Sequence, residues 1–334
     1  MQFLRSTGQL GELSKYEDDE LWQAIEARRA QDASELAAPS DAPDFKTPEW
    51  RVFTQHDPQL NNEDFRLTPV KVPAKFSRVI DQVVLVERLR EVRAMIGFTR
   101  LDAMGELTDP DLNIQTDPSP LSRQPSIWIP ADEVRGEGIF IQFNQFNEAK
   151  INAWLAQPAV HERGLAFFES HKKWRQARWI EPPEQGFPGM RYVLIHTFTH
   201  ALMRQLSLEC GYAAAGIRER LYIRPPESEG GPMAGVLIYT SAADSEGTLG
   251  GLVSLGQTET LARHIGQALE AARLCASDPL CAERPPSQSG RTLHAAACHA
   301  CLFAPETSCE RGNKYLDRST LVQTVEHDDL AFFD

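Results

Sequence analysis

Cysteines near the C-terminal end of this sequence have the spacing of a metal site. Five of the six cysteines follow one another as Cys275-x5-Cys281-x16-Cys298-x2-Cys301-x7-Cys309. A Cys-x2-Cys pair places two thiolates on one tight turn, and two further thiolates at loop distance complete a tetrahedral zinc site. Four thiolates leave no position for water, so we expect one structural Zn2+ per chain whose binding energy helps to fold the segment.

The spacing leaves open which four cysteines bind the ion. We expect Cys281, Cys298, Cys301 and Cys309, with Cys275 as the competitor for the first position because it follows the preceding helix. The alternative interpretation is that these are reduced cysteines buried for packing. In a reducing compartment, a cluster that contains Cys-x2-Cys more often holds metal than forms disulfides, so we favour zinc.

Two histidines form a second arrangement that could bind metal. His196 and His200 are four residues apart, which places both on one face of a helix. Asp244 could join them if the fold brings the end of a neighbouring strand close. The metalloprotease signature requires glutamate at position 197, where this chain has Thr197. We therefore favour two histidines packed in a polar part of the core over a hydrolytic site.

A third group combines cations with aromatic rings. Four basic residues between positions 172 and 178 are interleaved with Trp174 and followed by Trp179. Such a pattern can bind single-stranded nucleic acid through charge and stacking. A solvated helix face is the more ordinary interpretation. The candidate contacts with nucleic acid or a partner are Lys172, Lys173, Arg175 and Arg178.

Composition limits the classes of protein to which the chain can belong. The 334 residues are 42% hydrophobic and 24% charged, which suits a globular protein with one large domain. A formal net charge of -13 repels a phosphate backbone, so an autonomous DNA-binding domain is not expected. No window approaches the roughly 18 consecutive apolar residues of a membrane span, and the start lacks a signal peptide's apolar stretch. We expect a cytoplasmic protein without a membrane contact.

Two domains are expected along the chain. Residues 1–64 comprise a short helix at 16–29 and an acidic linker rich in proline and alanine. Residues 65–334 form the folded domain, with the zinc module at about 275–322. Within the domain, patterns predict strands at 79–86, 139–143, 221–223 and 235–240, and helices at 87–96, 147–179, 191–210 and 251–274. Strands and helices alternate, so the fold class is α/β, or mixed α+β.

Four segments in order resemble the MrfA-like zinc-binding domain, in the form found in the DrmB family of the DISARM anti-phage system. They are residues 196–222, 234–253, 275–281 and 296–322, and residues 86–102 also resemble the middle of that family. The resemblance is to the C-terminal half of full-length members, whose long N-terminal half carries its own cysteine pairs.

The resemblance implies a zinc-binding accessory subunit that is not itself an enzyme. In this family the module pairs with a separate superfamily-2 helicase subunit, DrmA, and reaches phage DNA through that complex. Two alternatives from other classes remain open. One is a metal-dependent hydrolase or nuclease using His196, His200 and Asp244, and the other is a free-standing nucleic-acid-binding module.

Overall fold

The computed structural model describes residues 11–26, 44–95, 97–98, 119–122, 128–144, 150–228, 230–240, 251–325 and 327–333. The chain divides into two units, Met1–Pro43 and Asp44–Asp334. In the first unit, the described residues form a 3-10 turn, η1 (Gly11–Lys15), and a helix at 18–26, within the predicted helix. The second unit begins earlier than the predicted boundary at residue 65.

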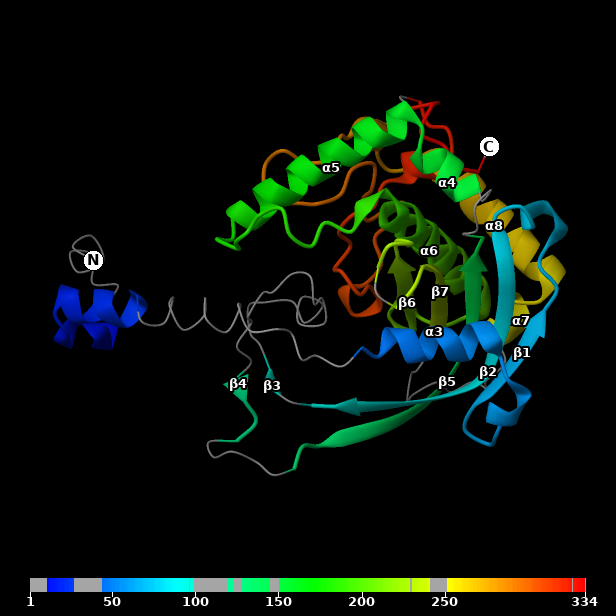
Figure 1. Ribbon diagram of the computed structural model, residues 1–334, viewed down its shortest axis with the longest axis horizontal. Coiled ribbons are helices and arrows are strands. Elements are labelled where there is room, and N and C mark those ends of the chain that lie inside the picture. The colour runs from blue at the N-terminus through cyan, green and yellow to red at the C-terminus, as the bar shows by residue number, and fades with distance from the viewer. Residues whose placement is uncertain are drawn as a thin grey trace. The chain divides into compact units, whose positions relative to one another are not determined.

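A five-stranded antiparallel sheet is the centre of the second unit (Figure 1). Its order is β1-β2-β5-β7-β6. All the pairings are antiparallel, so the fold is the mixed α+β form of the predicted class. The strands are β1 (Arg66–Val70), β2 (Ile80–Ala94), β5 (Ala131–Phe143), β6 (Ile217–Arg224) and β7 (Met233–Thr240). A separate short pair consists of β3 (Gly97–Phe98) and β4 (Ser119–Pro120).

The alternation of side chains along the strands divides the apolar residues between two cores. In β5, Ile139 and Ile141 belong to the larger core, and Phe140 between them belongs to the smaller one. In β6, Leu221 and Tyr222 divide in the same way. Both faces of the sheet are therefore covered, which explains why the central strands contain near-continuous apolar runs.

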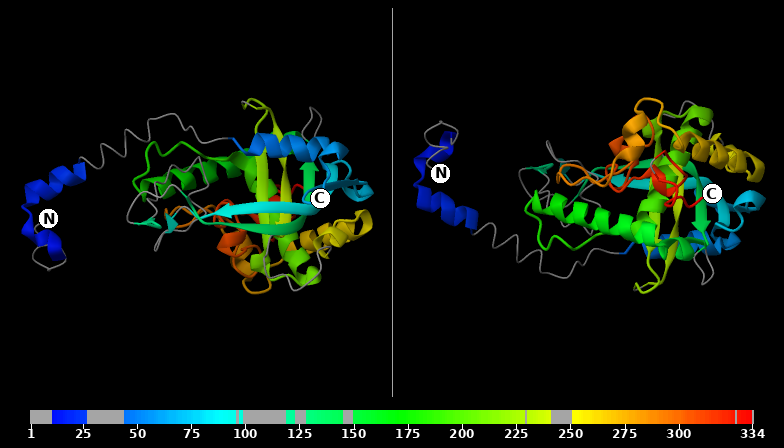
Figure 2. Two further views of the ribbon diagram at one scale, coloured as in Figure 1. Left: turned by 90° about the horizontal axis from the view of Figure 1, so that it is seen from below. Right: turned by 90° about the horizontal axis from the view of Figure 1, so that it is seen from above.

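Helices cover the two faces unequally (Figure 2). The helix α6 (Gly189–Cys210) packs on β6, β7 and α8 (Thr258–Ala272) on the side of the larger core. It ends at Gly211, which adopts the left-handed conformation that suits a helix C-terminus. The predicted helix at 191–210 is thus present.

The other face is covered by α3 (Lys46–Gln55), a helix inside the predicted linker. Trp50 and Phe53 on α3 are buried against Phe140 and Tyr222 of the sheet. The prediction of a linker was wrong here, because two aromatic side chains three residues apart are enough to hold a short helix onto an apolar sheet face.

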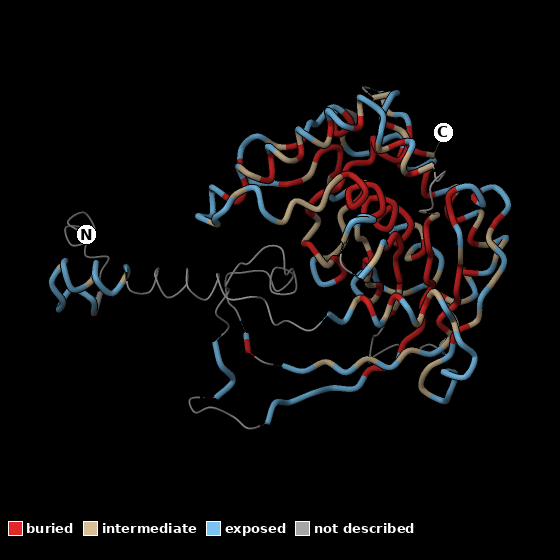
Figure 3. Tube along the Cα trace, in the orientation of Figure 1, coloured by how far each residue is buried: buried red, intermediate tan, exposed pale blue. Residues whose placement is uncertain are grey.

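The predicted helix at 87–96 is also wrong, because β2 continues to Ala94. Its register with β5 runs from Ile80 opposite Phe143 to Ala94 opposite Ala131, with an irregularity between Val86 and Leu89. Ladder hydrogen bonds to a neighbouring strand outweigh the helical spacing of Leu89 and Val92. Figure 3 shows that this extended end of the pair is largely exposed.

The predicted helix at 147–179 is divided into α4 (Lys150–Leu155) and α5 (Pro158–Gln176), since Pro158 begins a new helix. The predicted helix at 251–274 is likewise divided into α7 (Gly251–Leu255) and α8. The described residues after α8 contain only the short turns η6 (Pro279–Glu283), η7 (Glu306–Ser308) and η8 (Arg318–Thr320), yet many are buried. No described helix is long and apolar enough to cross a bilayer.

A test of this packing is available at Gly138 of β5. A Cβ at this position would lie 2.7 Å from the Ile238 carbonyl oxygen and 2.9 Å from Tyr239 Cβ. We expect Gly138→Ala to lower the free energy of unfolding by about 1–3 kcal/mol through overpacking. Urea titration measures this change. The control is Gly266→Ala in α8, where a Cβ meets nothing within 4 Å, so that variant should be neutral or more stable by up to about 1 kcal/mol. Equal midpoints for the two variants would contradict the described contact.

Candidate metal centre

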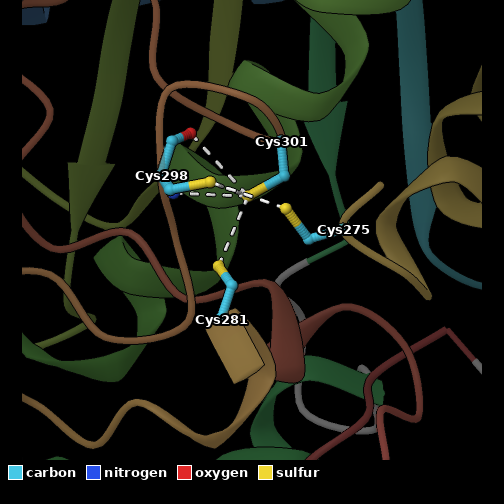
Figure 4. A group of neighbouring side chains, drawn as sticks. All are labelled: Cys275, Cys281, Cys298 and Cys301. Carbon is cyan, nitrogen blue, oxygen red and sulfur yellow. Dashed lines mark hydrogen bonds between the residues drawn. The ribbon is translucent and has the colours of Figure 1, made fainter. Parts of the chain in front are cut away.

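Four cysteine thiols meet where the segment after α8 folds back on itself (Figure 4). Cys275 follows α8, and Cys281 lies in η6, whose first turn is capped by the Asp278 carboxylate accepting from the Leu280 backbone N–H. Cys298 and Cys301 share one turn, closed by the Cys301 backbone N–H donating to the Cys298 carbonyl at 3.2 Å. The turn brings both sulfurs to the same side.

The sulfur positions fit a tetrahedral zinc ion. Cys298 Sγ lies 3.6 Å from Cys275 Sγ and 3.6 Å from Cys301 Sγ, and Cys281 Sγ lies 3.8 Å from Cys301 Sγ. Zinc–sulfur bonds of about 2.3 Å in a regular tetrahedron separate the sulfurs by about 3.8 Å. The donors therefore match zinc in both chemistry and spacing.

The surroundings of the thiols have opposing effects on their ionisation. Burial raises the pKa values of the Cys281 and Cys301 thiols. Burial also opposes ionisation of Cys298, but hydrogen bonds from the Ala300 backbone and from Cys275 outweigh it and lower the pKa of Cys298. The fully buried Arg318 guanidinium acts on Cys281 in the same favourable direction. A buried cation is needed here, because zinc with four thiolates carries two negative charges.

The sequence-based choice of ligands needs a correction, because the structure groups Cys275, and not Cys309, with the other three thiols. Seven residues lie between Cys301 and Cys309 in the chain, and η7 turns the backbone so that Cys309 comes to lie against α6 and β6. The competitor Cys275 occupies the position that Cys309 was expected to fill.

Cys309 instead belongs to a second cluster with His196, His200 and Glu219. One donor atom from each of the four residues lies within 4.8 Å of the others, and all four residues are buried. His196 Nε2 lies 3.2 Å from Cys309 Sγ and 3.1 Å from Glu219 Oε1. His200 Nε2 lies 3.5 Å from Glu219 Oε2. The predicted histidine pair is present, and its acidic neighbour is Glu219.

Sequence reasoning did not identify Glu219, although a signal was present. In β6, Ile217 and Leu221 on either side of it face the larger core, so strand alternation points Glu219 at the same buried face. A carboxylate at a core position of a strand requires a specific partner. The third predicted member, Asp244, lies outside the described residues.

Burial dominates the ionisation of this second cluster. It lowers the pKa of His196 and raises that of the Cys309 thiol well above its usual range. For Glu219, burial acts to raise the pKa, but the charges of His196 and His200 outweigh it and hold the pKa well below the ordinary value. Burial and the neighbouring side chains thus act in opposite directions on the pKa of Glu219.

The basic-aromatic group on α5 is mostly engaged within the protein. Arg175 is fully buried. Lys172 pairs with Glu169 at 2.7 Å, Lys173 donates to Gln288 at 2.6 Å, and Arg178 stacks on the Trp174 ring at 4.1 Å. Lys172, Lys173 and Arg178 thus remain near the surface. Lys173 and Arg178 also connect α5 to the segment after η6, because Arg178 donates to the Gly290 carbonyl at 3.0 Å.

Comparison with known proteins agrees with this geometry. Residues 198–302 match the MrfA Zn-binding domain family, a range that includes all four clustered thiols. The DISARM protein DrmB of Bacillus paralicheniformis is 38% identical over 294 residues, which cover 86% of this chain and 49% of that protein. The chain is a relative of DrmB. It spans about half the length of this curated relative. The predicted resemblance and the predicted structural zinc are confirmed.

Variants of this DrmB relative test the four-thiol site. We expect Cys298→Ser combined with Cys301→Ser to lose one equivalent of zinc per chain and to unfold at a lower temperature, because zinc binding is coupled to folding. Cys275→Ser should lose the same equivalent, since its sulfur is one of the four. Elemental analysis and thermal unfolding measure both effects, with Cys210→Ser as the control because Cys210 lies in neither cluster. Unchanged zinc content in Cys275→Ser would remove Cys275 from the site.

Proposed function

We propose that this protein is a non-catalytic, zinc-stabilised subunit of a DISARM-like anti-phage defence complex in the cytoplasm. Its partner is a superfamily-2 helicase subunit of the DrmA kind, and the complex acts on phage DNA. The observation that carries the proposal is the 38% identity to DrmB along 86% of the chain. The four proposed ligands of the structural zinc are Cys275, Cys281, Cys298 and Cys301.

The chemistry of the metal site supports a non-catalytic role. A catalytic zinc keeps a coordination position for water or substrate, whereas four thiolates close the coordination shell. The four-thiol cluster crosslinks the end of α8, η6 and the turn at 298–301. Zinc there would fix the shape of a surface made of irregular segments, which suits a subunit that docks on a partner.

Charge supports contact with DNA through a partner rather than by the chain alone. The net charge of -13 opposes phosphate at long range. On α5, Lys172 and Lys173 stand near the surface, while Arg175 is buried and is removed from the proposed contact. Trp179 beside them is 90% exposed and offers a face for stacking. These groups can neutralise only a few phosphates, so a helicase must supply the rest of a basic track.

The alternative of a metal-dependent hydrolase has less support. In the described part of the chain, His196 and His200 lie buried together with Glu219 and Cys309, so neither imidazole is exposed to a polymeric substrate. We expect no metal-dependent cleavage of DNA, RNA or peptide by the purified chain. Hydrolysis that required metal and disappeared in His196→Ala would favour the hydrolase instead.

The central test is a DNA titration with and without the DrmA-like helicase. We expect weak, salt-sensitive binding of single- and double-stranded DNA by the chain alone, and a large gain in affinity when the helicase is added. Fluorescence anisotropy at near-physiological salt measures both. Nanomolar binding by the chain alone, in the range of specific DNA-binding proteins, would favour a free-standing nucleic-acid-binding module.

Variants locate the contact within the complex. Lys172→Ala with Lys173→Ala should weaken DNA binding by the complex and reduce the slope of log affinity against log salt by about 1 per lost phosphate contact. The matched control is Arg263→Ala with Arg273→Ala on and after α8, which removes two exposed, ion-paired cations. If the two double variants weakened DNA binding equally, Lys172 and Lys173 would be ordinary solvated side chains of a helix face and not DNA contacts.

A further inference from the structure

We infer that His196, His200, Glu219 and Cys309 hold a second metal ion of the zinc class, separate from the ion of the four-thiol cluster. The donors come from three parts of the fold. The two histidines lie on α6, Glu219 lies on β6, and Cys309 directly follows η7. Such a site would fasten the C-terminal segment to both the sheet and its central helix.

The distances between donor atoms fit a tetrahedral ion. Zinc bonds to nitrogen, oxygen and sulfur at their usual lengths separate neighbouring ligands by about 3.3–3.6 Å. The observed separations from His196 Nε2 are 3.1 Å to Glu219 Oε1 and 3.2 Å to Cys309 Sγ. His200 Nε2 lies 3.5 Å from Glu219 Oε2. The four groups already stand close to the spacing that an ion requires.

Hydrogen bonds around the cluster orient the donors inward. His200 Nδ1 lies 2.9 Å from the Leu302 carbonyl oxygen, an arrangement in which Nδ1 donates a proton and Nε2 keeps a lone pair. The Asn313 backbone N–H donates to Cys309 Sγ at 3.2 Å, as amides commonly do to thiolates. Hydrogen bonds of this kind fix the histidine tautomer and the orientation of ligands in known metal sites.

Two buried atoms of the cluster face each other with no hydrogen bond. His200 Nε2 and Glu219 Oε2 both lack a hydrogen-bond partner among the described residues. With Nδ1 as the donor, both are acceptors, and two facing acceptors in a buried site are costly. A cation between them satisfies both at once.

Charge balance leads to the same assignment. Among the described residues, Glu219 forms ion pairs only with the two histidines, and no lysine or arginine neutralises it directly. A divalent ion with one carboxylate, one thiolate and two neutral imidazoles has no net charge, so it can be buried at low electrostatic cost. The mixed nitrogen, sulfur and oxygen donors favour zinc over calcium or magnesium, which prefer oxygen alone.

The site is closed and therefore structural. The exposed fractions of the four residues are 0% for His196, 1% for His200, 3% for Glu219 and 4% for Cys309. It also connects to the four-thiol cluster through the chain, because Leu302, whose carbonyl orients His200, directly follows Cys301. Both ions together would determine the path of the segment from 298 to 309.

The decisive experiment uses the unmodified full chain, purified without added metal. We expect elemental analysis to find two zinc ions per chain, where the four-thiol cluster alone gives one. Zinc X-ray absorption should show five sulfur and three nitrogen or oxygen ligands shared by two ions, as the two clusters supply them. One zinc per chain with four sulfur ligands would overturn the inference without any variant.

Substitutions then assign the second ion. Cys309→Ser and Glu219→Gln should each lose one of the two zinc equivalents and keep the sulfur-rich signal of the remaining ion. Cys298→Ser combined with Cys301→Ser should remove the sulfur-rich signal of the four-thiol ion. Cys210→Ser should change neither the zinc content nor the X-ray absorption signal. Retention of both equivalents in Cys309→Ser would also overturn the assignment, because that substitution removes the one sulfur donor of this site.

Discussion

The burial of a C-terminal segment that has almost no regular secondary structure is the constraint on which the rest of this fold depends. After α8, the described chain forms only three short turns, yet Cys281, Leu302, Tyr315 and Phe332 are buried. Backbone groups in such a segment lack the ladders that satisfy helices and strands. Crosslinks through metal-binding side chains supply the order that hydrogen-bond ladders supply elsewhere.

The helix α6 provides the surface on which that segment lies. Its residues from Met190 to Met203 are buried on every side, because the sheet covers one face and the C-terminal segment covers another. Thr197 accepts a hydrogen bond from the Asp317 backbone N–H at 3.0 Å. The Asp317 carboxylate in turn pairs with Arg163 of α5 at 2.8 Å, with both side chains nearly inaccessible. Loss of one partner in such a buried pair typically costs about 3–5 kcal/mol, so this contact fixes the position of the segment strongly.

Buried charge is distributed so that each centre has its own compensation. Arg318 lies beside the four-thiol cluster, where its Nη1 donates to the Ala272 and Arg273 carbonyls at 2.9 and 3.0 Å. Its charge opposes the excess negative charge of four thiolates around zinc. The second cluster has one carboxylate and one thiol group, and in the described part of the chain Glu219 makes no ion pair with a lysine or arginine. Four thiolates around a divalent ion leave two negative charges to be compensated, whereas one carboxylate and one thiolate leave none, so only the four-thiol cluster needs an additional cation.

The sequence by itself determined the chemistry of this protein and much of its local structure. Cysteine spacing predicted the zinc, the spacing of His196 and His200 predicted a polar pair on one helix face, and apolar runs predicted the cores of β2, β5 and β7. These succeeded because they depend on neighbours in the chain. Only the tertiary structure decided that residues 87–94 continue a strand, since pairing with β5 overrides helical spacing. It also placed Cys275 in the four-thiol cluster and Cys309 in the second cluster, and it brought Glu219 next to the two histidines. Ligand identity is a matter of distance in space, and the turns that set those distances depend on packing against α6 and β6, which no local pattern encodes.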